Sequence, residues 1–73
     1  MAQIENFDKK IDVIRNELEK FYSKVSYIKS ETNISRRHIY NCDDEIIMVD
    51  NYKRVYKIIG QNEKILLPLK IDV

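Results

Sequence analysis

Apolar residues at strict seven-residue spacing over the first third of the chain constrain its fold more than any other feature. Two heptad positions are apolar in four consecutive heptads, and together they form a set called here the heptad seam: Ile4, Phe7, Ile11, Ile14, Leu18, Phe21, Val25 and Ile28. Alternating spacings of three and four place these side chains on one narrow stripe of a helix, as in a coiled coil. Because no Gly or Pro interrupts the region, the sequence predicts a long helix over residues 3–33.

The composition of the heptad seam also bears on how such helices would pair. Its second position holds Phe and Ile in place of the Leu that parallel dimers prefer. Parallel pairing would also set Lys10 against Arg15 and Lys24 against Lys29, which are like charges. We therefore expect an antiparallel pair or a larger bundle, and the sequence leaves that choice open.

A polar connection, residues 34–44, follows the predicted helix. Ser30, Thr32, Asn33 and Ser35 favour caps and turns, so the helix should end near Thr32–Asn33. Residues 36–40 fit a helix remnant and a short strand equally well.

From Glu45 onward the apolar period is two, which is typical of strands. Turn signals after Asp50 and at Gly60 divide residues 45–73 into three predicted antiparallel strands. Four apolar residues alternate with more polar ones in the last strand and should point inward: Ile65, Leu67, Leu69 and Ile71. The predicted fold is a single α+β domain over residues 1–73, with a long N-terminal heptad helix followed by a small antiparallel β-meander.

The length of the chain favours self-association. A core built from 73 residues is marginal, and Cys42 is the only cysteine, so no internal disulfide can reinforce it. A helix of about 25 residues is roughly 37 Å long, whereas a strand of about six residues spans about 20 Å. The predicted sheet would leave part of the helix uncovered. We therefore expect a homo-oligomer that forms through the heptad seam.

No motif in the sequence carries catalytic or metal chemistry. His38 and Cys42 lie four residues apart, but they are only half of a tetrahedral zinc site and no second pair exists. The acidic run Asp43, Asp44 and Glu45 lacks the staggered ligands and glycine of a calcium loop. We expect no catalytic residue, metal site or cofactor, and the protein is not expected to be an enzyme.

Interleaved cations and aromatic residues are the best functional signal in the second half of the chain. This basic-aromatic set comprises Arg36, Arg37, His38, Tyr40, Tyr52, Lys53, Arg54, Tyr56 and Lys57. Such residues can grip phosphates and stack on bases. They can equally form the polar face of a strand that contacts another protein, and the formal net charge of +1 gives no global attraction to nucleic acid.

The expected function is that of a small, non-catalytic, homo-oligomeric protein-interaction module, such as an assembly subunit, adaptor or inhibitor of a larger protein. The alternative is a nucleic-acid-binding regulator that uses the basic-aromatic set. Neither a signal peptide nor an apolar run long enough to cross a membrane is visible, so we expect a cytoplasmic protein with no membrane partner. The abundance of Ile, Lys and Asn is compatible with an AT-rich coding genome, as in many phages and mobile elements.

Overall fold

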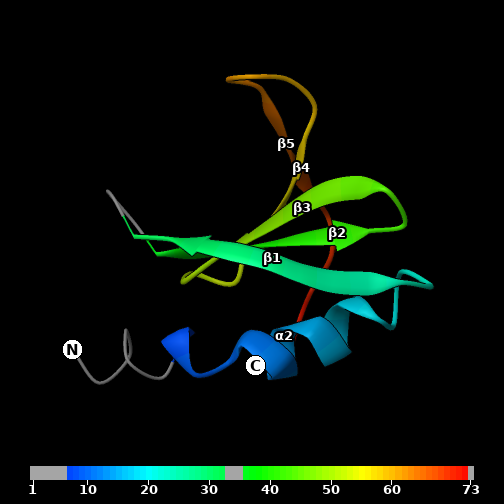
Figure 1. Cartoon of the computed structure of the whole chain (residues 1–73), viewed down its shortest axis with the longest axis vertical. Coiled ribbons are helices and arrows are strands. Elements are labelled where there is room, and N and C mark those ends of the chain that lie inside the picture. The colour runs from blue at the N-terminus through cyan, green and yellow to red at the C-terminus, as the bar shows by residue number, and fades with distance from the viewer. Residues whose placement is uncertain (1–6, 33–35, 73) are drawn as a thin grey trace.

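The structure, a computed structural model, describes residues 7–32 and 36–72. Helix α2 (Ile11–Leu18) precedes five strands: β1 (Val25–Glu31), β2 (Arg37–Cys42), β3 (Glu45–Asp50), β4 (Val55–Ile58) and β5 (Lys64–Leu67). Each strand pairs antiparallel with its neighbour in the chain, in the order β1-β2-β3-β4-β5 (Figure 1). The predicted α+β class and antiparallel meander are therefore confirmed. Within the described ranges, no helix has the length and apolar character needed to cross a membrane.

The predicted helix over residues 3–33 is wrong in its extent, because α2 ends at Leu18. Beyond this point the backbone leaves the helix and is held by the side chain of Asp43. One carboxylate oxygen of Asp43 accepts a hydrogen bond from the Ser23 N–H at 3.0 Å, and the other accepts one from the Lys24 N–H at 2.7 Å. Strand β1 begins immediately afterwards. A contact with a residue about 20 positions away thus holds the start of β1.

Strand β1 contains the last two members of the heptad seam. Val25 belongs to the core, whereas Ile28 lies on the opposite face, as expected for two residues separated by an odd number along a strand. The pairing register of β1 with β2 shifts between Tyr27 and Lys29, so Ile28 is the extra residue of a β-bulge. Val, Tyr and Ile are favoured in strands, so the local preference agrees with the observed structure.

The predicted connection over residues 34–44 contains β2. Together with β1, which lies within the predicted helix, β2 makes the sheet five-stranded rather than three-stranded. Strands β2 and β3 are joined by a two-residue turn at Asp43 and Asp44, whose φ angles are 51° and 70°. Positive φ at both positions is the requirement of a type I′ turn, which suits the twist of a hairpin. Asn41 supports the turn by accepting a hydrogen bond from the Asp44 N–H at 3.0 Å.

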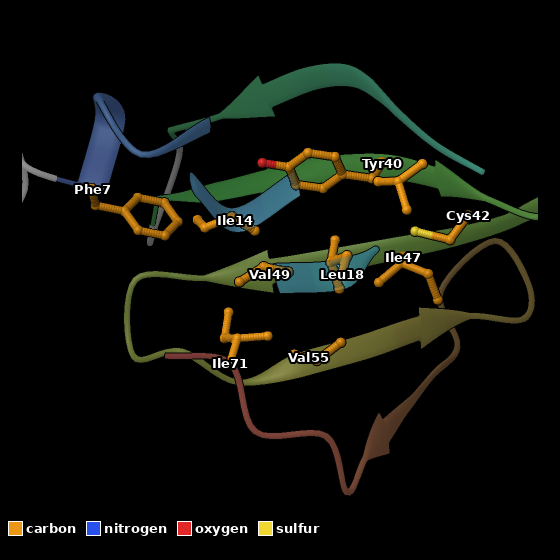
Figure 2. Close-up of a cluster of buried hydrophobic side chains, with 10 residues drawn as sticks. Phe7, Ile14, Leu18, Tyr40, Cys42, Ile47, Val49, Val55 and Ile71 are labelled. Atoms are coloured by element: carbon orange, nitrogen blue, oxygen red, sulfur yellow. The ribbon is translucent and has the colours of Figure 1, made fainter. Parts of the chain in front are cut away.

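The core lies between α2 and the face of the sheet that points toward it, called here the inner face (Figure 2). Seven of its side chains, from the helix and three strands, are fully buried: Ile14, Leu18, Tyr40, Cys42, Ile47, Val49 and Val55. The Tyr40 hydroxyl donates a hydrogen bond to the Ile11 carbonyl at 2.7 Å, so helix and sheet are joined by a polar contact as well.

The segment after β5 returns to the helix and completes the core (Figure 1). Ile71 is buried, and Leu67 and Leu69 pack against the core, as the period-two pattern predicts. Ile65 shares the side of β5 that carries Leu67, as predicted, but it is 47% exposed rather than buried. Ile65 pairs with Lys57 in the part of the β4–β5 hairpin that extends away from α2, so no helix covers it (Figure 1).

Candidate functional site

The heptad seam, predicted as an oligomer interface, is largely used inside the chain. Phe7, Ile14 and Leu18 are buried in the core, and Ile11 packs against it. Phe21 lies beyond the helix and is 47% exposed. The two remaining described members, in β1, face opposite sides of the sheet, and Ile4 lies outside the described residues. A continuous interhelical stripe is therefore not formed.

The basic-aromatic set is divided between the two faces of the sheet and the β3–β4 turn. His38 and Tyr40 are buried on the inner face, whereas Arg37 and Tyr56 lie on the opposite face, called here the outer face. Tyr52, in the turn, is 69% exposed. The structure does not gather these residues into one surface.

Most cations of the basic-aromatic set are also paired with carboxylates of the chain. Arg36 Nη1 lies 2.9 Å from Asp8 Oδ2, and Lys57 Nζ lies 2.9 Å from Glu45 Oε2. The Glu45 carboxylate, as hydrogen-bond acceptor and nearby charge, raises the pKa of Lys57. These contacts neutralise the charge that a phosphate would otherwise meet.

The third pair, Arg54 with Asp50, shapes the β3–β4 turn. Arg54 Nε donates to Asp50 Oδ2 at 2.9 Å, while Asp50 Oδ1 accepts the backbone N–H groups of Tyr52 and Arg54, both at 2.9 Å. The Arg54 guanidinium also lies over the Tyr52 ring, 5.1 Å from its centroid. Asp50 is buried, so this carboxylate satisfies a turn in which Lys53 adopts a positive φ of 67°. The cluster is explained by the turn alone.

A hydrogen-bonded chain surrounds the buried His38. Its Nε2 donates to the Phe7 carbonyl at 2.9 Å, and its Nδ1 lies 2.6 Å from Ser30 Oγ, which in turn lies 2.6 Å from Tyr27 Oη. A carbonyl can only accept, so Nε2 carries a proton, and in the neutral imidazole Nδ1 then accepts from Ser30. This Ser–His pair has the contact of a nucleophile and its base. Neither Ser30 nor His38 lines the groove on the opposite face of the sheet, and we interpret this series of hydrogen bonds as structural.

The single thiol is poorly suited to nucleophilic chemistry. Cys42 is fully buried on the inner face, and burial, together with the neighbouring Asp43 and Glu45, raises its pKa to about 12. Only the thiolate is an effective nucleophile, and at neutral pH this group remains a thiol. Within residues 7–32 and 36–72, no group of three or more His, Cys, Asp and Glu side chains could hold a metal ion.

The outer face contains a groove of about 630 Å³ that no sequence pattern indicated. Strand β1 bounds it on one side, and the turn between β4 and β5 bounds it on the other. Its aliphatic lining comes from four strands: Ile28, Ile39, Ile46, Met48 and Ile58. Ile39 and Met48 are cross-strand partners and are nearly buried, whereas Ile28 is 45% exposed. The groove therefore has an apolar floor and a partly exposed wall.

Three cations and two carboxylates also line this groove: Lys29, Arg37 and Lys64, with Glu31 and Glu63. Its formal charge is thus +1, and the charged groups stand around an aliphatic floor. An apolar concavity with a few convergent polar groups is the usual form of a binding site.

Sequence reasoning identified Arg37 but missed the aliphatic residues beside it. The available signal was the alternation in β3 and β4: Ile46 and Met48 share the outer face, and so do Tyr56 and Ile58. That alternation is weak in β3, because both faces of this strand are apolar. The groove also needs β1, which was predicted as helix.

Comparison of this chain with protein-family models, with curated proteins and with solved structures gives no match.

Proposed function

We propose that this chain is a small, non-catalytic protein-interaction module that binds a partner protein through the outer-face groove. The observation that carries the proposal is an aliphatic groove on the face of the sheet that α2 does not cover. Antiparallel sheets with one solvated face normally present polar side chains there. An apolar patch on such a face is typical of an interaction site.

The exposed apolar side chains around the groove support this proposal. Leu66 is 58% exposed and Ile28 is 45% exposed, on strands at the two edges of the sheet. Met48, Tyr56 and Leu66 are successive cross-strand partners, so a row of apolar and aromatic side chains leads from Met48 in the groove to Leu66 on the same face. Burial of apolar surface is worth about 25 cal/mol per Å², and a partner that covers this row would gain from it.

A protein partner fits the surface better than a nucleic acid does. Arg36, Arg54 and Lys57 each pair with a carboxylate of the chain at 2.9 Å. The Tyr56 ring also contacts a cation of the chain, since Lys64 Nζ lies 4.8 Å from its centroid. Phosphate binding would have to compete with these contacts.

The homo-oligomer expected from the sequence stays a prediction. Ile14 and Leu18 are fully buried against the chain's own sheet, so a second copy cannot contact them unless the core opens. Self-association would therefore have to use another surface.

Site-specific crosslinking tests the proposed function. A photoreactive amino acid at Leu66, on the outer face, should crosslink a partner protein in the native host. The matched control is the same amino acid at Ile65, which is similarly exposed but lies on the other side of the strand. Crosslinking at Leu66 should disappear when Ile58→Asp places a charge in the groove. Equal crosslinking at both positions, or salt-sensitive sub-micromolar binding to a short oligonucleotide, would contradict the proposal.

A further inference from the structure

Arg37 stands in the groove with unused hydrogen-bonding capacity. Its side chain is only 22% exposed, and it lines the groove beside the aliphatic floor. One terminal nitrogen donates to Met48 Sδ at 3.6 Å, which is a weak acceptor. Nε is buried and has no hydrogen-bond acceptor among the residues that the structure describes. Because the side chain is partly exposed, the terminal nitrogens of the guanidinium can donate to an additional acceptor.

The two carboxylates on the neighbouring strands do not fill this requirement. Glu31, the partner of Arg37 on β1, forms ion pairs with Arg37 Nε at 3.9 Å and with Lys29 Nζ at 3.7 Å, but both distances are too long for hydrogen bonds. Asp50, the partner on β3, directs its oxygens to Arg54 and to the backbone of the β3–β4 turn. The terminal nitrogens of the guanidinium are therefore able to donate hydrogen bonds to a carboxylate from outside the chain.

The groove offers one positive charge and an aliphatic floor at the same place. Its charged lining sums to +1, and Ile39 and Met48 lie beside Arg37. Its volume of about 630 Å³ falls within the usual range of volumes for ligand-binding pockets. Charge complementarity thus selects an occupant with one carboxylate next to an apolar side chain.

We infer that the groove binds a short peptide segment of a protein partner in which an aliphatic residue is adjacent to a carboxylate, and that Arg37 anchors this carboxylate. The inference rests on the proposed function and specifies the partner's chemistry. The aliphatic side chain would contact Ile39 and Met48, and the carboxylate would accept hydrogen bonds from the Arg37 guanidinium.

Selection from a library of random heptapeptides displayed on phage, with the full chain immobilised, tests the inference. Enriched peptides should combine Leu, Ile, Val or Met with a neighbouring Asp or Glu. A synthetic peptide of the enriched sequence should bind the Arg37→Gln variant at least tenfold more weakly. Lys53→Gln, which removes an exposed cation from the β3–β4 turn, is the matched control and should leave the affinity unchanged.

A double-mutant cycle makes the test specific to the ion pair. Replacing the peptide's Asp by Asn, or its Glu by Gln, should weaken binding to the unmodified chain by at least tenfold but have no further effect on Arg37→Gln. Thermal unfolding of Arg37→Gln shows whether the variant is folded, and Arg37→Lys should restore part of the affinity if charge is what the peptide requires.

The alternative outcomes separate this inference from the proposed function. Groove-binding peptides without an acidic residue, or equal peptide affinity for Arg37→Gln, would overturn the inference and leave the proposed function standing. Peptides that bind Ile58→Asp as well as the unmodified chain would overturn both. Binding of decanoate but of no peptide would assign the groove to a fatty acid. Self-association that Ile58→Asp abolishes would assign it to a second copy, and either result would overturn the inference.

Discussion

His38 is joined to Phe7 by two contacts at once. The ring of His38 stacks on that of Phe7 at a centroid distance of 4.2 Å and an interplanar angle of 9°, and its Nε2 donates to the Phe7 carbonyl at 2.9 Å. These residues are 31 positions apart, so the pair fixes the segment before α2 to strand β2. An aromatic residue at position 7 therefore contributes both apolar area and a backbone acceptor to one polar core residue.

Truncation of His38 to alanine should destabilise the fold by about 2–4 kcal/mol. His38→Ala leaves the Phe7 carbonyl without its donor and removes the stacked ring from a site that is only 1% exposed. Chemical denaturation measures the change in the free energy of unfolding. Tyr52→Ala removes a side chain that is 69% exposed and should have a much smaller effect. Similar losses for the two variants would contradict a structural role for His38.

A charge at position 14 should unfold the single chain rather than dissociate an oligomer. Ile14 is fully buried between α2 and the sheet, so Ile14→Asp would bury an unpaired carboxylate at a cost of several kcal/mol. Circular dichroism and light scattering together check this outcome. A variant that stays folded but changes from oligomer to monomer would show that the heptad seam contacts another chain.

Ile65 and Leu67, two positions apart in β5, should lose different amounts of stability on truncation to alanine. Leu67 packs against the core, and Leu67→Ala should cost about 1–3 kcal/mol. Ile65 lies beyond the reach of α2 and is 47% exposed, so Ile65→Ala should cost less than about 1 kcal/mol. Urea denaturation of the two variants compares them directly. Equal losses would mean that the hairpin is covered in solution.

The two aspartates of the β2–β3 turn should respond in opposite directions to glycine. Asp44 has a φ of 70°, and Asp44→Gly should stabilise the fold by about 0.5–1 kcal/mol because glycine adopts this conformation without strain. Asp43→Gly also relieves a positive φ but removes the carboxylate that binds Ser23 and Lys24, and should destabilise by about 1–2 kcal/mol. Thermal unfolding distinguishes the two. A gain in stability for both variants would mean that the Asp43 carboxylate does not hold the start of β1.

The parts of the fold that depend on residues close together along the chain are predictable from the sequence. Helical spacing places Ile11, Ile14 and Leu18 on one side of a helix whatever that side contacts. The turns after Asp50 and around Gly60 are also where local turn preferences place them. The start of β1 is different, because it is held by Asp43, about 20 residues later. Heptad spacing continues through Val25 and Ile28 by coincidence, in a strand that places these two apolar side chains on opposite faces.

The candidate groove was unpredictable for the same reason. Its lining combines Ile28 of β1 with Met48 of β3 and Ile58 of β4, and no local pattern brings these residues together. Arg37 was predicted as a surface residue from its basic neighbours. Its orientation toward Met48, on the face opposite His38, follows only from the strand register. Composition can identify the cations of such a site, whereas the pairing of strands decides which of them share a surface.

Acid should weaken the contact between α2 and the end of the chain through Glu17. Lys20 Nζ lies 2.8 Å from Glu17 Oε2, and the Asp72 N–H donates to Oε1 at 3.0 Å. These hydrogen bonds, with Lys20 the larger cause, hold the pKa of Glu17 below its ordinary value of 4.5. A carboxyl whose pKa is lower in the folded state than in the unfolded state stabilises the fold above the unfolded-state pKa. That contribution is lost as the pH falls through the lower, folded-state pKa.

The measurement is the difference in unfolding free energy between the unmodified chain and Glu17→Gln, taken by urea denaturation from pH 7 to pH 2.5. The glutamine keeps the size of the side chain and an oxygen that can accept from Asp72, but it cannot carry the charge that pairs with Lys20. The difference should favour the unmodified chain at pH 7 and disappear in acid. Glu19→Gln, at an exposed glutamate just beyond α2, is the matched control for loss of a negative charge at this end of the helix. A difference that is constant across the range, or that grows as the pH falls, would show that Glu17 does not hold the C-terminal segment in its charged form.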